Sequence, residues 1–169
     1  SFDGEPRNTD LLVLARDQHG SYLIAVEAKA DEAFSATVAD TLVAATERYL
    51  KSDRSKGVAR LLQLGQAILG PRQESEPEIG LLRYQLLTAT AGALCEGKRR
   101  ECLRVLLLVH EFVTDRTDDA LHNRNAQDLN LFVGRLSHGH VNGVGYNEIQ
   151  GPFDVPGAPL CLNAPALYI

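Results

Sequence analysis

A glutamate and a lysine stand two residues apart inside the apolar segment "YLIAVEAKAD", residues 22–31. Side chains alternate across a β-strand, so Glu27 and Lys29 point to one side of the strand that this segment predicts. Asp10 begins a second apolar run, "DLLVLAR", and the polar "DQHGS" between the runs has the composition of a turn. In such a hairpin the start of the first strand lies beside the end of the second, which brings Asp10 next to Glu27 and Lys29.

Two carboxylates and an ammonium group at one end of a buried sheet suit a hard cation. Mg²⁺ prefers one or two carboxylates together with water and substrate phosphate oxygens. Lys29 would then orient or deprotonate the attacking water. The alternative is structural, since an ion pair or a solvated sheet end would hold the same residues without any chemistry.

Asp10 in "NTDLLVLAR", followed one hairpin later by Glu27-Ala28-Lys29, resembles the signature of the PD-(D/E)XK nuclease superfamily. The resemblance implies a restriction-endonuclease-like fold, with Asp10, Glu27 and the backbone carbonyl of Ala28 as metal ligands and Lys29 as the catalytic lysine. It also implies Mg²⁺ or Mn²⁺ as cofactor and hydrolysis of phosphodiester bonds, in DNA rather than RNA. The family core has a helix and a strand ahead of the aspartate strand. Only nine residues precede Asp10, so these elements are missing from this sequence or the core is built differently.

The Glu-x-Lys spacing alone is weak evidence for a site, because Glu96-Gly97-Lys98 has the same spacing. That second copy lies at the predicted end of a helix and has no strand aspartate upstream. Only the copy at residues 27–29 has both the apolar strand and the hairpin partner.

Gln85 is the next candidate catalytic residue. It lies among Leu82, Leu86 and Ala89 on the apolar stripe of a predicted helix. We expect it to be at least partly buried and to face the carboxylate end of the hairpin. Many superfamily members resemble this arrangement in placing a glutamine on such a helix. A core amide that bonds a neighbouring backbone group is the alternative.

Two basic clusters, "KSDRSKGVAR" (51–60) and "GKRR" (97–100), are candidates for phosphate contacts or simply charged connections between helices. His138 and His140 lie in a glycine-containing segment with no third ligand in register. That context favours a solvated loop over a metal site.

The elements that must position these residues follow from apolar periodicity. "CLRVLLLVHEF" (102–112) predicts a strand at the centre of the sheet. The order of elements predicts an α/β or α+β domain with a central mixed sheet, and the continuously apolar runs predict helices on both of its faces. Further elements are expected as helices over 37–51, 58–69, 79–97 and 125–137 and a short strand near "LCLNA" (160–164).

Length and composition indicate a single domain over residues 1–169, with a Gly/Pro-rich tail over about 138–169. A net charge of −5 argues against coating nucleic acid by charge alone, but not against a local basic patch with metal ions. No apolar run approaches the roughly 20 residues of a membrane span, so no membrane partner is expected. The absence of methionine predicts that Ser1 is not the native start.

Three cysteines, Cys95, Cys102 and Cys161, without a CxxC pattern favour reduced thiols in a cytoplasmic protein.

The sequence leaves two questions open. The protein could form a homodimer, and it could belong to a second functional class, a catalytically inactive nuclease-fold module that serves interaction or structure.

Overall fold

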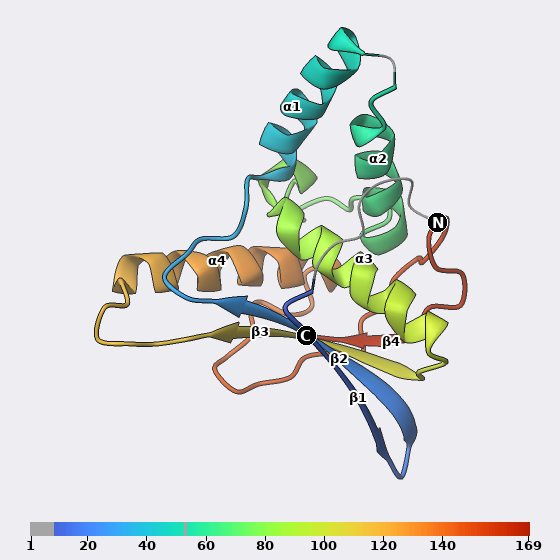
Figure 1. The fold of residues 1–169 in the computed structure, drawn as a ribbon, viewed down its shortest axis with the longest axis vertical. Coiled ribbons are helices and arrows are strands. Elements are labelled where there is room, and N and C mark those ends of the chain that lie inside the picture. The colour runs from blue at the N-terminus through green and yellow to red at the C-terminus, as the bar shows by residue number, and fades with distance from the viewer. Residues whose placement is uncertain (1–8, 53) are drawn as a thin grey trace.

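An α/β arrangement is built on one mixed sheet of four strands (Figure 1). The computed structural model of the chain describes residues 9–52 and 54–169. The strand order is β1-β2-β3-β4, with β1 antiparallel to β2 and the other neighbours parallel. Along the chain the elements are β1 (Leu11–Asp17), β2 (Gly20–Lys29), α1 (Val38–Lys51), α2 (Gly57–Ile68), the 3₁₀ turn η1 (Ile79–Leu81), α3 (Tyr84–Arg99), β3 (Arg104–Glu111), α4 (Asp119–Leu136) and β4 (Ala166–Tyr168).

The predicted β-hairpin is confirmed as β1 and β2. The two strands pair in antiparallel register, with Leu11 opposite Val26. Gly20 closes the tight turn with a φ of 109°, a left-handed conformation that glycine adopts readily. Because the pairing is antiparallel, Asp10 falls one step beyond Leu11, at the level of Glu27. The hairpin therefore brings the first carboxylate to the end of β2 that carries the second.

The predicted central strand is also confirmed. β3 lies parallel between β2 and β4, and its register places Glu111 level with Lys29. Val105 and Leu107 on this strand are 0% and 1% exposed. Both point to the same side of the sheet as Lys29, because paired residues on neighbouring strands share a face.

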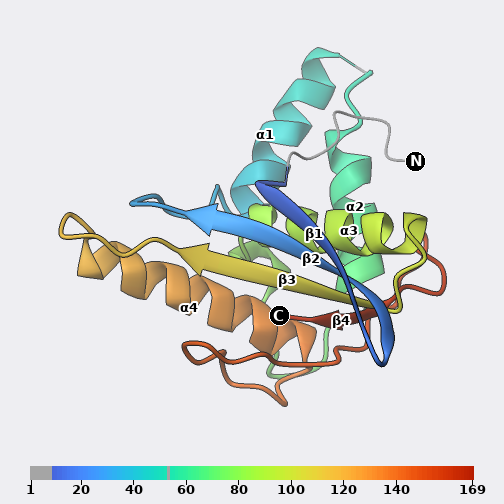
Figure 2. The same cartoon turned by 60° about the horizontal axis from the view of Figure 1, so that its bottom comes forward.

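Helices lie on only one face of the sheet, which corrects the prediction of helices on both faces. α3 packs on β2 and β3, and α4 reaches the same side, where its Asn125 donates to Glu111 Oε1. Figure 2 looks onto the opposite face, which no helix of the described residues covers. There Leu11, Val13 and Leu108 are 54%, 37% and 40% exposed. Apolar residues on both sides of a strand predict two covered faces only if every helix packs on the sheet, and α1 and α2 do not.

α1 and α2 instead form a helical hairpin that stands away from the sheet (Figure 1). A capping box starts α1: the Thr37 side chain accepts the Asp40 N–H, and the Asp40 carboxylate accepts the Thr37 N–H. α2 packs between α1 and α3 and buries residues such as Leu64. Gly57 lets the two helices approach closely, since a Cβ there would lie 2.9 Å from the Cβ of Ala45.

Three predicted elements have different bounds in the structure. α4 begins at Asp119 rather than 125, because the Asp118 side chain accepts the Ala120 N–H and starts the helix ahead of its apolar stripe. The helix expected over 79–97 is divided into η1 and α3. "LCLNA" is not a strand; β4 follows it and pairs with β3 from Ala166 to Tyr168.

The C-terminal tail is irregular apart from β4, yet it packs against the body of the protein. Phe153 forms an isolated antiparallel bridge with Leu167, and Cys161 is 4% exposed. Among the described residues, no helix combines the length and apolar composition that crossing a membrane requires.

Candidate functional site

Glu27 and Lys29 lie together on the face of β2 that packs against α3. Each residue is only 3% exposed. Lys29 Nζ is 3.3 Å from Glu27 Oε1 and 3.2 Å from Glu32 Oε1. The predicted placement of both charges on one side of the strand is confirmed. Burial of two charges is tolerable here because the ions are paired and hydrogen-bonded.

Gln85 connects the two buried charges from a different element. It lies in the first turn of α3 and is half-buried. Its Nε2 donates to Glu27 Oε1, while its Oε1 accepts from Lys29 Nζ at 3.1 Å and from the Ser35 N–H at 3.0 Å. The predicted position of Gln85 is confirmed, and a catalytic role for it stays a prediction.

Asp10 lies at the open end of the hairpin and is exposed. Its Oδ2 accepts the Ala28 N–H at 2.8 Å, which extends the β1–β2 ladder past the Leu11–Val26 pair. The N–H and C=O of one strand residue point toward the same neighbouring strand. The Ala28 carbonyl therefore also points to the side where Asp10 lies, as the predicted ligand set requires.

These groups match a small hard cation in number and type. Two carboxylates and a carbonyl leave coordination positions for water and phosphate oxygens, which is how proteins usually bind Mg²⁺. Within residues 9–52 and 54–169, no three His, Cys, Asp or Glu side chains gather closely enough to hold a metal. A cation would therefore depend on Asp10, Glu27 and Ala28 together with water, and it would share the Glu27 carboxylate with Lys29.

A short segment after β2 closes over the lysine. Phe34 is 3% exposed, and its ring centroid lies 5.3 Å from Lys29 Nζ. Asn125 of α4 holds this segment: its Oδ1 accepts the Phe34 N–H at 3.3 Å, and its Nδ2 donates to the Glu32 carbonyl at 3.0 Å. Sequence reasoning missed Glu32, Phe34 and Asn125. The hydrogen bonds to Asn125 join positions about ninety residues apart in the sequence, so no local sequence pattern signals them.

Glu111 continues the polar cluster along β3. Its Oε1 accepts Asn125 Nδ2 at 2.7 Å, and its Oε2 lies 2.5 Å from His122 Nδ1. The sequence suggested no role for Glu111. Polar contacts thus run from Glu27 through Lys29 and the segment after it to the carboxyl end of β3, across the edge of the sheet.

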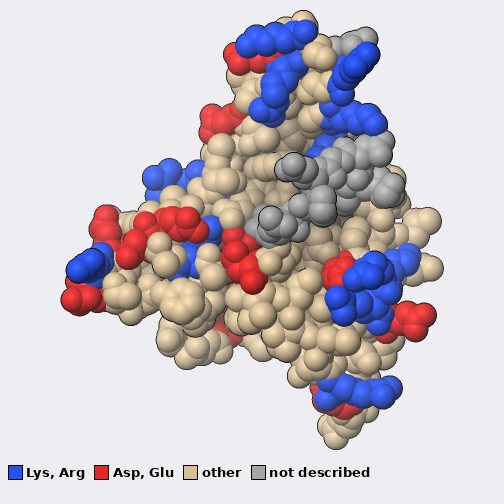
Figure 3. All heavy atoms as spheres, viewed as in Figure 1, with Lys and Arg blue, Asp and Glu red and all other residues tan. Residues whose placement is uncertain are grey.

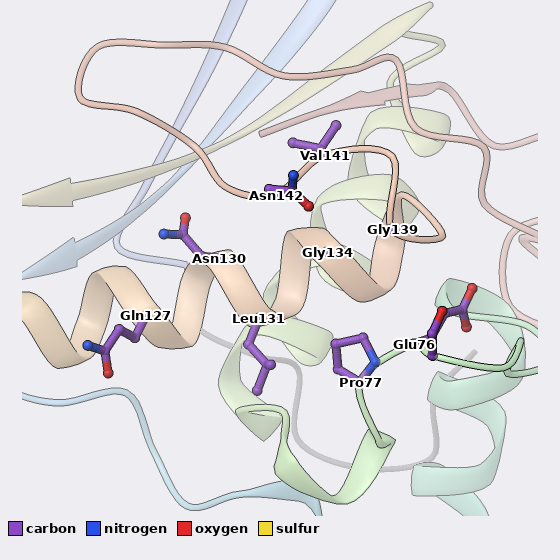
Figure 4. Close-up of a pocket in the computed structure, with 10 residues that line it drawn as sticks. Glu76, Pro77, Gln127, Asn130, Leu131, Gly134, Gly139, Val141 and Asn142 are labelled. Carbon is purple, nitrogen blue, oxygen red and sulfur yellow. The ribbon is translucent and has the colours of Figure 1, made fainter.

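A pocket of about 410 Å³ lies elsewhere, along α4 and the loop that follows it (Figure 4). Its lining includes Glu76, which pairs with Arg135 Nη1 at 3.0 Å and His138 Nδ1 at 2.6 Å. The Gln73 N–H, with His138 and Arg135, holds the pKa of Glu76 below its usual 4.5. His138 is therefore bonded rather than solvated as expected. No residue of the Glu27, Lys29 and Gln85 cluster lines this pocket.

The fold and its buried carboxylate–lysine–amide cluster define an α/β protein whose polar groups gather at the carboxyl ends of β2 and β3. The chain belongs to the family described as a domain of unknown function, DUF6946, whose model matches residues 2–164. No curated protein and no solved structure matches the chain.

Proposed function

We propose that this protein is a metal-dependent nuclease with a restriction-endonuclease-like core, which hydrolyses phosphodiester bonds in DNA rather than RNA. The observation that carries the proposal is the joint burial of Glu27 and Lys29, bridged by Gln85, next to the Asp10 carboxylate at Ala28. A sheet end that served only as surface would leave such charges in water, where each is stable without partners.

The charge of each residue determines its proposed role. Asp10, Glu27 and the Ala28 carbonyl would hold Mg²⁺ or Mn²⁺, which supplies positive charge to the phosphate oxygens as negative charge develops. Lys29 would orient the attacking water and stabilise the same charge. Gln85 positions Lys29 and Glu27, because its amide bonds both.

One observation favours the alternative of a catalytically inactive nuclease-fold module. An ammonium group has three hydrogens, and Lys29 already has three oxygen partners, on Glu27, Glu32 and Gln85. Phe34 packs over the same group. Water or a phosphate could reach Lys29 only after the segment that carries Glu32 and Phe34 moves, whereas a purely structural cluster would remain as it is.

A cleavage assay separates the two functions. The full chain is incubated with linear, circular and single-stranded DNA and with RNA, in the presence of Mg²⁺, Mn²⁺ or EDTA. Metal-dependent cleavage that EDTA abolishes, and that Lys29→Ala loses, would support the nuclease. Absence of cleavage on every substrate with either metal would refute it in favour of the interaction module.

A further inference from the structure

The connection between α1 and α2 concentrates positive charge at the far end of the helical hairpin. Residues 47–60 contain five basic and two acidic side chains, a net charge of +3, whereas the rest of the chain carries −8. Figure 3 shows Lys and Arg side chains gathered over the outer end of the two helices. The exposed basic residues there are Arg48, Lys51, Arg54 and Lys56. The molecule is an acidic body with a basic projection.

The fold does not use these charges internally. Within the described residues, Arg48, Lys51 and Arg54 make no ion pair. The second basic cluster, at the end of α3, is different, because Arg99 and Arg100 bond Glu96 at 2.7 Å and 2.5 Å. In the hairpin cluster, Lys51 and Arg54 pair with no carboxylate of the described residues, whereas in the α3 cluster Arg99 and Arg100 pair with Glu96 and Lys98 donates to the Leu162 carbonyl.

Helix stability explains only part of this pattern. Arg48 and Lys51 lie in the last turn of α1, where a cation interacts favourably with the helix dipole. Lys56 is at the N-cap of α2, where a cation opposes the dipole, and the first turn of α2 has no acidic residue. Arg54 lies between the helices. The helix dipole therefore gives a reason for Arg48 and Lys51 but none for Arg54, which makes no ion pair within the described residues.

The hairpin begins at the candidate site. The Val38 N–H donates to the Leu82 carbonyl at 2.8 Å, and Thr37 bridges to Arg83, two residues ahead of Gln85. α1 has 14 residues, so at about 1.5 Å per residue its basic end lies on the order of 20 Å from its start. One DNA strand advances about 3.4 Å per nucleotide, so this length corresponds to roughly six nucleotides.

We propose that the α1–α2 hairpin is a nucleic-acid-binding arm, whose cations contact backbone phosphates of duplex DNA. The binding itself does not depend on cleavage. The further statement, that these phosphates lie about six nucleotides from the one at Lys29, rests on the proposed nuclease function. Exposed Val43 and Leu50 beside the cations are also typical of a helix on an anionic membrane. DNA is favoured because the arm begins beside the Glu27, Lys29 and Gln85 cluster, which suits phosphate chemistry.

Two double variants of equal charge change test the arm. Lys51→Gln/Arg54→Gln removes two arm cations, and Arg99→Gln/Arg100→Gln removes two cations that pair with Glu96. Binding of the full chain to a labelled duplex of about two helical turns is measured by fluorescence anisotropy in EDTA across a salt series. Each lost phosphate contact should reduce the slope of log K against log salt by about 0.9. The arm variant should therefore lose about 1.8 in slope and bind more weakly at low salt, and the control variant should match wild type.

The outcomes are distinct. An arm variant that binds the duplex with wild-type affinity and slope would overturn the arm, as would tighter binding of wild type to phosphatidylserine-containing vesicles than to the duplex. If the arm variant alone loses DNA binding while no variant or wild type cleaves, the arm stands and the nuclease proposal fails. If wild type cleaves, the deficit of the arm variant should vanish on substrates that end within about six nucleotides of the cut.

Discussion

The same three-residue pattern, Glu-x-Lys, occurs in two regions of this molecule with different results. On β2, Glu27 and Lys29 point to one face and meet at 3.3 Å, because side chains two residues apart share a side of a strand. At the end of α3, Glu96 and Lys98 diverge, because residues two apart do not face each other on a helix. Glu96 bonds Arg99 and Arg100, and Lys98 donates to the Leu162 carbonyl.

The middle residues of the two patterns differ as well. A Cβ on Gly97 would clash with Val105 Cγ2, so this glycine lets α3 approach β3. Ala28 points away from the helices, and its N–H is the donor to Asp10. The comparison teaches that spacing acquires chemical meaning only through the element that carries it: the strand copy concentrates charge in a buried place, and the helix copy disperses it at the surface.

The sharpest test compares Lys29→Ala with Lys98→Ala. Loss of Lys29 should reduce cleavage by a factor on the order of 10² to 10⁴, because the water loses its orienting group. Divalent-metal binding should persist, since Lys29 is not a ligand. Loss of an exposed lysine at 98 should leave the rate unchanged. Rates from the cleavage assay and metal titration by calorimetry measure both.

Lys29→Ala should also reduce the free energy of unfolding by about 3 kcal/mol, because it leaves the Glu27 carboxylate buried without its cation. Glu27→Gln in the same chain should restore part of that stability but no cleavage, which separates a folding defect from lost chemistry. A Lys29→Ala protein that cuts as fast as wild type would disprove the assigned role even if the fold is right.

Gln85→Ala tests the amide that bridges Glu27 and Lys29, a contact that the Glu96-Gly97-Lys98 pattern lacks. Without the amide, the Ser35 N–H and the buried Glu27–Lys29 pair each lose a hydrogen-bond partner, so the free energy of unfolding should fall by about 1–3 kcal/mol. Cleavage should decline as the two charges lose their alignment. The control is Gln63→Ala, an exposed glutamine on α2, which should change stability by less than about 0.5 kcal/mol in urea denaturation. Equal effects of both variants would remove Gln85 from the site.

Asp10→Asn tests the carboxylate that the hairpin brings beside Glu27 and Lys29. An asparagine oxygen can still accept the Ala28 N–H, so the hairpin should fold, but one negative charge is lost. The Mg²⁺ concentration that supports half-maximal cleavage should rise on the order of tenfold. Asp17→Asn is the control at the other end of β1, where the carboxylate pairs with Arg104 at 2.6 Å. If both variants shift the metal requirement equally, Asp10 is not a ligand.

The sequence was sufficient for features that depend on local periodicity. Two apolar runs and a polar turn predicted the hairpin, a period of two placed Glu27 and Lys29 together, and the helical stripe oriented Gln85 toward them. Each of these follows from where neighbouring side chains point. The metal ligands, the catalytic roles and the restriction-endonuclease-like core remain predictions.

Features that depend on which elements meet in space could not be predicted in the same way. An apolar stripe shows that a helix buries one face, but not that α2 packs on α3 and leaves a sheet face bare. Likewise, the buried amide of Asn125 must find partners, but its sequence position does not reveal that they are Phe34, Glu32 and Glu111. The closure over Lys29 is therefore visible only in the structure.

The smallest expected effect concerns Glu96, in the Glu-x-Lys pattern at the end of α3, and it is an effect on stability at acidic pH. The Arg99 hydrogen bond, aided by Arg100, lowers the pKa of Glu96 from 4.5 to about 2. Because the folded pKa lies below the unfolded one, the pair contributes stability that is fully present above pH 4.5 and is lost as pH falls toward 2. The contribution should be about 1 kcal/mol or less, since the pair lies at the surface and salt screens it. Glu96→Gln should lower the free energy of unfolding by this amount at pH 7, and the difference from wild type should shrink as urea denaturation is repeated at falling pH. Cleavage should be unaffected. A difference that stays constant with pH would show that Glu96 stabilises α3 by packing rather than by charge.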